Sequence, residues 1–148
     1  MTVKLAWYYP DQVAIMQLIG ETSATEFMQA SEILYDWYDN SPTERIHLIV
    51  DDTYLTKLPN LAGLTKVKIH PKRGTIIIVA IPNKLMEFLA NVAVQISKAK
   101  VLFVDTLPEA DVTMKKIAQG LVQLPAPTDI VWLEEITDNN FETLSSDH

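Results

Sequence analysis

The chain has 148 residues, of which 48% are hydrophobic and 21% charged. This length and composition fit one globular domain and exclude disordered, collagen-like and coiled-coil chains. The absence of cysteine excludes disulfides, thiolate metal sites and a cysteine nucleophile. The net charge of -7 argues against nucleic-acid binding, which depends on basic residues that neutralise phosphates. No apolar run approaches the ~20 residues of a membrane span, and the N-terminal residues from Met1 to Lys4 lack the apolar core of a secretory signal. We therefore expect a cytoplasmic protein.

The first third of the chain predicts a hairpin followed by a helix. Val3 to Tyr9 and Val13 to Ile19 are rich in aromatic and branched residues, and the turn-forming pair Pro10-Asp11 separates them. Ser23-Ala24-Thr25-Glu26 has the spacing of a capping box, so we expect a helix from there to about Asn40. Its apolar face is formed by residues three and four positions apart: Phe27, Ala30, Leu34, Trp37 and Tyr38.

Alternating buried strands and amphipathic helices follow. The predicted strands are Ile46 to Val50, Thr75 to Ile81 and Val101 to Val104, and the predicted helices are Pro59 to Val67, Asn83 to Lys98 and, after a capping box at Thr106-Leu107-Pro108-Glu109, a last helix to Gly120. The order β-β-α-β-α-β-α-β-α predicts an α/β fold: an opening β-hairpin and then alternating α/β units, in a mixed and mostly parallel sheet flanked by helices.

The chain divides near residue 122. Pro125 and Pro127 break the pattern there, so we expect a domain over residues 1–122 and a C-terminal extension over 123–148. Within the extension, Ile130 to Leu133 is a candidate for a short docked strand. The acidic, polar composition from Thr137 onward predicts a partly disordered tail.

The strand ends carry a family resemblance. The hairpin with three αβ units, together with Leu48-Ile49-Val50-Asp51, His70-Pro71 before Gly74, and Val104-Asp105-Thr106-Leu107-Pro108-Glu109-Ala110, resembles STAS-like proteins, a family named for sulfate transporters and anti-sigma-factor antagonists. The likeness covers residues 3 to about 122 and identifies the chain as a divergent member. It implies a noncatalytic module that acts by protein–protein contact.

The antagonists in this family carry a phosphorylatable serine or threonine in the loop after the strand equivalent to Ile46–Val50. In this chain that stretch falls on Lys57-Leu58-Pro59-Asn60, which lacks a hydroxyl at the acceptor position, while Thr53 and Thr56 lie close by. The resemblance thus implies a partner-binding loop that contains Asp51, Asp52, Thr53, Thr56, Lys57 and Asn60. Phosphorylation at Thr53 or Thr56 stays open.

A basic stretch continues this surface. From Thr53 to Met86 there are six basic residues and no acidic one, whereas Glu134 to His148 holds five acidic residues and no lysine or arginine. The basic residues favour either a solvated surface or a docking face for an acidic partner or for the chain's own tail. The candidates for such a face are Lys66, Lys68, Lys72 and Arg73.

The remaining signals for chemistry are weak. Asp51, Asp52 and Asp105 follow two predicted strands, where ligands bind in open parallel sheets, and could hold Mg²⁺, although aspartates at this position more often cap the next turn. His47, His70 and His148 lack a ligand spacing, and the four glycines are too far apart to cradle phosphate. We therefore expect no cofactor, no resident metal and no catalysis.

Aromatic residues gather near the start of the chain. Trp7, Tyr8 and Tyr9 are consecutive in the first strand, and Tyr35, Trp37 and Tyr38 lie in the first helix. They indicate either a covered core or an interface. If the first strand or the Ile130–Leu133 segment lies at an edge of the sheet, it could pair with a second copy and form a homodimer.

Three functions remain as hypotheses. The first is a regulatory or scaffolding module that binds an unknown protein partner. The second is a carrier that holds a small apolar or anionic ligand between the sheet and the helices predicted at Pro59–Val67 and Asn83–Lys98. The third is a Mg²⁺-dependent enzyme that uses Asp51, Asp52 and Asp105.

Overall fold

The predicted hairpin opens the fold. In the computed structural model, which describes residues 2–21, 23–57, 70–80, 100–117 and 130–136, β1 (Thr2–Tyr9) pairs antiparallel with β2 (Val13–Glu21). The Gln12 amide donates to the Tyr9 carbonyl oxygen at 3.0 Å, and Asp11 has a φ of 61°. Proline at the second position and a left-handed residue at the third define a type II turn, which confirms the predicted turn.

The conformation of Asp11 leads to a stability prediction. Glycine adopts positive φ without steric cost, so we expect Asp11→Gly to raise the free energy of unfolding by about 0.5–1 kcal/mol. Asp11→Val should lower it instead, because a β-branched side chain is strained at this φ. Urea unfolding of both variants measures these changes. Equal stability of the glycine and valine variants would contradict the assignment of the turn.

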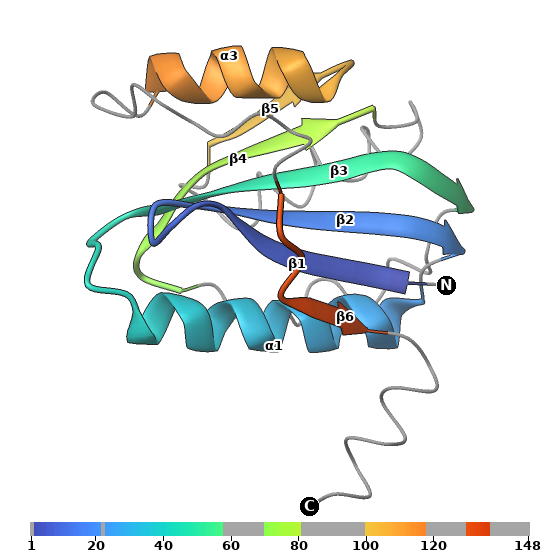
Figure 1. Cartoon of the computed structure of the whole chain (residues 1–148), viewed down its shortest axis with the longest axis horizontal. Coiled ribbons are helices and arrows are strands. Elements are labelled where there is room, and N and C mark those ends of the chain that lie inside the picture. The colour runs from blue at the N-terminus through green and yellow to red at the C-terminus, as the bar shows by residue number, and fades with distance from the viewer. Residues whose placement is uncertain (1, 22, 58–69, 81–99, 118–129, 137–148) are drawn as a thin grey trace, which may run out of the picture.

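Within the described ranges, six strands form one mixed sheet in the order β5-β4-β3-β2-β1-β6. The parallel strands are β2, β3 (Ile46–Lys57), β4 (Arg73–Val79) and β5 (Val101–Val104), while β1 runs antiparallel to both of its neighbours. A helix covers each face of the sheet: α1 (Ala24–Asn40) one face and α3 (Leu107–Ile117) the other (Figure 1). The predicted α/β architecture is confirmed, since a mixed sheet, parallel from β2 to β5, carries a helix on each face. The helices predicted between β3 and β4 and between β4 and β5 fall outside the described residues.

Each face of the sheet has its own apolar core. Under α1 the buried residues are Val3, Leu5, Ala14, Met16, Leu18, Ala30, Leu34, Tyr38, Ile46, Val50, Ile78 and Ile136. On the α3 side they are Ala6, Tyr8, Val13, Ile15, Ile49, Ile77, Val79, Ala110 and Met114. Adjacent residues of one strand divide between the two cores because successive side chains point to opposite faces.

This division also explains how the consecutive aromatic residues of β1 are packed. Trp7 stacks on Trp37 of α1, with ring centroids 5.3 Å apart, whereas Tyr8 is fully buried on the α3 side and donates its hydroxyl to Asp111 at 3.0 Å. Tyr9 packs, partly buried, against the same α3-side core. Burial and the neighbouring Asp111 carboxylate raise the pKa of Tyr8. Here these aromatic residues are core residues.

The helix starts follow the predicted caps. Ser23 Oγ accepts from the Glu26 amide and Glu26 Oε1 from the Ser23 amide, both at 3.1 Å, so the first capping box is confirmed. At α3, Thr106 Oγ1 accepts from the Glu109 amide at 3.3 Å. Glu109, however, reaches the amide of Asp105 rather than that of Thr106, so only half of the second box forms.

The C-terminal segment closes the edge of β1. Ile130 and Trp132 pack on the α3-side core, and then β6 (Glu134–Ile136) pairs antiparallel with β1 and inserts Ile136 into the α1-side core. The predicted strand at Ile130–Leu133 is therefore displaced to residues 134–136. Since β6 covers β1, the first strand is not an edge of the sheet.

Other predicted elements either have different bounds in the structure or lie outside the described residues. The strand β3 continues to Lys57 instead of ending at Val50, and β4 begins at Arg73 instead of Thr75. The helices predicted at Pro59–Val67 and Asn83–Lys98, the end of the last helix and the acidic tail lie outside the described residues. Within the described ranges, no helix has both the length and the apolar character that a membrane crossing requires.

Candidate functional site

The aspartates predicted to follow a strand lie inside one. Asp51 and Asp52 belong to β3 and are 2% and 3% exposed. The sequence suggested a strand end because paired carboxylates are unusual in a sheet. The strand continues because β2 remains alongside it, with Ile19 opposite Tyr54 and Gly20 opposite Leu55.

Asp51 is held by polar neighbours on β2 and β3. Its Oδ1 accepts from the amide and the hydroxyl of Thr53, at 3.0 and 2.5 Å. Its Oδ2 accepts from Nε2 of Gln17 at 3.1 Å, and Gln17 is directly opposite Asp51 in the parallel pairing of β2 and β3. The carboxylate is thereby fixed in one orientation.

A pocket opens beside Asp51 at the carboxyl edge of the parallel strands. Its volume is about 510 Å³, and it lies between the ends of β3 and β5, the start of α3 and the segment before β6. It is lined by Gln17, Asp51, Thr53, Tyr54, Asp105, Thr106, Leu107, Pro108, Ile130 and Trp132. The predicted approach of Asp51 and Asp105 is therefore found in the structure, because Asp51 of β3 pairs with Val79 of β4 and Val79 pairs with Val104 of β5, the residue before Asp105.

Asp52 is not part of this lining. Its Oδ1 is buried without a hydrogen-bond partner. Burial, and to a lesser degree the charge of Asp51, raise the pKa of Asp52 from 3.8 to about 7. An unpaired buried carboxylate is costly when charged, so this side chain favours its protonated form.

The magnesium hypothesis finds no ligand set in the part of the chain that the structure describes. No group of three histidine, cysteine, aspartate or glutamate residues is placed there to hold a metal ion. Asp51 and Asp105 face one pocket, whereas the third predicted ligand, Asp52, does not. The three aspartates therefore do not converge.

The described residues predicted to bind a partner lie in a strand rather than a loop, and Asp51 and Asp52 are buried in it. Thr53, Tyr54 and Thr56 are exposed in the last part of β3, and Tyr54 is 58% accessible. The backbone of Lys57 ends this strand. Asn60, Lys66 and Lys68 lie outside the described residues, so their predicted roles stay predictions.

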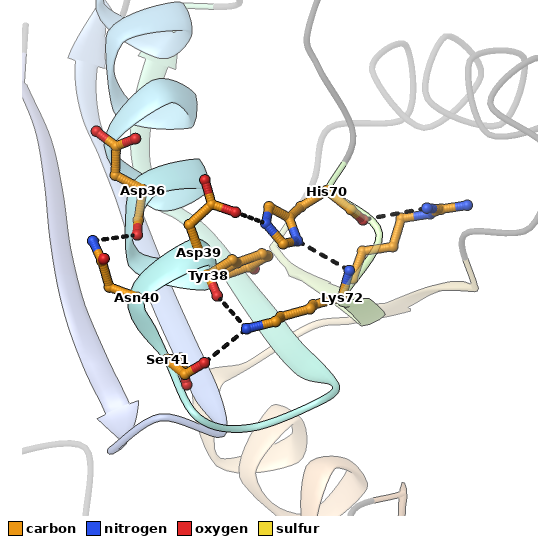
Figure 2. Close-up of polar contacts among 8 residues, drawn as sticks. Asp36, Tyr38, Asp39, Asn40, Ser41, His70 and Lys72 are labelled. Atoms are coloured by element: carbon orange, nitrogen blue, oxygen red, sulfur yellow. Dashed lines mark hydrogen bonds and ion pairs between the residues drawn. The ribbon is translucent and has the colours of Figure 1, made fainter.

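Lys72 and Arg73, predicted on a basic surface, make contacts within the chain. Nζ of Lys72 donates to the carbonyl oxygens of Tyr38 and Ser41, at 2.9 and 2.7 Å, where α1 ends (Figure 2). This cation satisfies helix carbonyls and complements the helix dipole. Arg73 Nη1 donates to the carbonyl oxygen of His70 at 3.3 Å.

His70 links the end of α1 to the turn before β4. Its Nδ1 accepts from the Lys72 amide at 3.0 Å, which places the ring proton on Nε2, and Nε2 lies 2.6 Å from Oδ1 of Asp39 (Figure 2). The ring is 7% exposed and contacts Tyr35 and Tyr38 edge-on. These contacts make His70 a structural residue that joins two segments.

His47 has a related role. Its Nδ1 accepts from the Thr75 amide at 2.9 Å across β3 and β4. Gly74 leaves the room for this contact, since a Cβ there would lie 2.4 Å from Nδ1 of His47. Burial and the nearby Arg45 lower the pKa of His47, so the neutral ring that accepts this hydrogen bond is favoured.

Sequence reasoning missed much of the pocket. Gln17 gave no signal because a glutamine in a strand is ordinarily solvated, and its role depends on its register with Asp51. Trp132 was assigned to a docked strand but not to a ligand site. Tyr54 was missed because β3 was predicted to end four residues earlier.

The comparisons with known proteins add no identification. No protein-family model matches the chain, and a search of curated proteins finds no match. The STAS-like resemblance therefore stays a prediction that rests on the topology and the strand-end motifs of this chain.

Proposed function

We propose that the chain is a noncatalytic regulatory or scaffolding module of the STAS-like type, which acts by protein–protein contact through the end of β3. The single observation that carries the proposal is the unequal length of the strands. β4 pairs with β3 only as far as Asp51, whereas β2 pairs with it out to Lys57. Within the described chain, residues 52–57 have a strand neighbour on one side only.

The chemistry of this segment suits a partner that adds a strand. An unpaired strand edge offers backbone donors and acceptors to an extended peptide, and side chains beside it supply specificity. Tyr54 is the largest exposed side chain of the segment, and tyrosine is enriched among the residues that dominate binding energy. The partner's strand would lie along β3 beyond the end of β4.

The test compares two substitutions that place a charge at an exposed apolar residue. Tyr54→Asp changes the proposed surface, and Val112→Asp changes α3 at a residue of similar exposure, 52% against 58%. The measurement is the amount of each host protein that the wild-type chain captures from the native host. We expect this amount to fall at least about tenfold with Tyr54→Asp, since one hot-spot residue contributes 1.4 kcal/mol or more to binding, and to stay unchanged with Val112→Asp. Capture that is equal for both variants would refute the assignment of the surface.

Phosphorylation is compatible with this surface at one of the two predicted threonines. Both hydroxyl residues are exposed. Thr53 donates to Asp51 and shares a pocket with Asp105, so a phosphate there would lose a hydrogen bond and add like charge. Thr56 does not line that pocket and is the better acceptor. A phosphate on Thr56 would alter the partner surface directly.

The carrier hypothesis is supported by a different cavity from the one expected. The helices predicted to enclose it lie outside the described residues, but the pocket beside Asp51 is large enough for a small molecule. Its two carboxylates disfavour an anion.

A further inference from the structure

We propose that the pocket beside Asp51 binds a small organic cation, with its ammonium group at the Asp51 carboxylate and its apolar part against the side chains of the segment before β6. This site shares Thr53 and Tyr54 with the partner surface of β3, but the proposal does not rest on the proposed function. The argument comes from charge, open acceptor capacity and apolar lining.

The charge of the lining is one-sided. Asp51 and Asp105 are acidic, and no lysine, arginine or histidine is among the lining residues that the structure describes. Lys4 is a cation close to this lining, because its Nζ lies 6.0 Å from the centroid of the Trp132 ring, but it does not itself line the pocket. Even if Lys4 offsets one charge, the pocket attracts a cation, and a buried carboxylate such as Asp51 is stabilised by one.

Asp51 retains capacity to accept another donor. Each carboxylate oxygen accepts about two hydrogen bonds. Oδ1 is filled by the amide and hydroxyl of Thr53, whereas Oδ2 accepts only from Gln17 among the described contacts. An ammonium N–H directed at Oδ2 would complete this set, and the orientation of the carboxylate is already fixed.

The rest of the lining suits a carbon skeleton rather than a hydrated metal ion. Leu107, Pro108, Ile130 and Trp132 provide an apolar wall, and Tyr54 lies on the exposed side. Aromatic rings attract organic cations through their faces, as the position of Lys4 over Trp132 already illustrates. Magnesium would instead require several oxygen ligands in octahedral geometry.

A titration of the purified full chain tests this proposal, with n-butylammonium chloride as the probe. The matched controls are sodium butyrate and 1-butanol, which keep the alkyl chain and change the charge, at constant ionic strength. Amide and indole resonances of ¹⁵N-labelled protein report binding. We expect saturable shifts at Thr53, Thr106 and the Trp132 indole for the ammonium salt only, with a Kd of about 1–10 mM, typical of so small a ligand.

Three substitutions locate the site. Asp105→Asn changes an exposed residue, so we expect it to preserve the fold. Asp51→Asn should keep the contacts with Thr53, and Gln17 can turn its amide so that its oxygen accepts from the new Nδ2. Each should weaken binding at least about fivefold, because one charge at short range is lost, while Asp36→Asn on exposed α1 should leave it unchanged. Linear shifts without saturation, equal binding of butyrate, or unaltered affinity in both pocket variants would overturn the proposal.

Discussion

Asp52→Asn is expected to raise the free energy of unfolding by about 4 kcal/mol at pH 8 and to change it little at pH 3. Asparagine has the shape of the protonated carboxyl group but cannot ionise. In the folded chain the pKa of Asp52 is about 7, because burial and Asp51 disfavour its charge, against 3.8 as its ordinary value. The difference corresponds to about 4 kcal/mol at 1.36 kcal/mol for each pKa unit.

The direction of the pH dependence follows from proton binding. Between about pH 4 and pH 7 the folded chain holds the Asp52 proton and the unfolded chain has released it. Raising the pH through this window therefore destabilises the wild-type fold, and the asparagine variant lacks this loss. At pH 5.4 the advantage of the variant should be about half of its value at pH 8.

Urea unfolding at pH 3, 5.4 and 8 gives the difference in the free energy of unfolding between wild type and variant. Ionisable groups that are present in both proteins contribute equally to the two values, so their titrations cancel in this difference. Asp36→Asn, at an exposed residue of α1, controls for the loss of one negative charge. A stabilisation of Asp52→Asn that is the same at all three pH values would contradict a raised pKa of Asp52 in the folded chain.

His70→Ala should lower the free energy of unfolding by about 3 kcal/mol. The substitution removes the hydrogen bonds to Asp39 and to the Lys72 amide and leaves a cavity against Tyr35 and Tyr38. Each lost hydrogen bond contributes about 1 kcal/mol, and truncation of a buried ring adds a cavity cost. A loss of this size is a large share of the 5–15 kcal/mol that is typical of a domain.

His70→Asn is the informative companion. Its Oδ1 can accept from the Lys72 amide as Nδ1 of His70 does, so it should restore about 1 kcal/mol relative to alanine. Asp39→Ala, at an exposed carboxylate, should cost less than His70→Ala. Thermal unfolding of the three variants gives the ranking, and an unchanged midpoint for His70→Ala would contradict a linking role.

The described helices α1 and α3 and most of the described strands could be predicted because their signals are local. The capping box at Ser23 and the apolar face of α1 are short-range patterns that tertiary packing supports. The buried strands were recognisable as apolar runs that need cover on both faces. The turn at Asp11 was evident from its residue types.

The site was harder to predict because it depends on distant contacts. β3 continues beyond the two aspartates because Gln17 and Thr53 donate hydrogen bonds to the Asp51 carboxylate, and because β2 remains paired with it. β6 escaped notice because two of its three residues are exposed glutamates and only Ile136 is buried. A strand that buries a single side chain shows almost no alternation of hydrophobic and polar residues in its sequence.

The pairing of β1 with β6 also fixes the order in which the sheet can be completed. Residues 2–9 are synthesised well before their partner residues 134–136, so the outer side of β1 has no β6 alongside it while the residues between them are made. Exposed strand edges recruit other chains, and contacts between distant residues form slowly. The outer side of β1 is thus open to pairing with other chains until β6 has been synthesised.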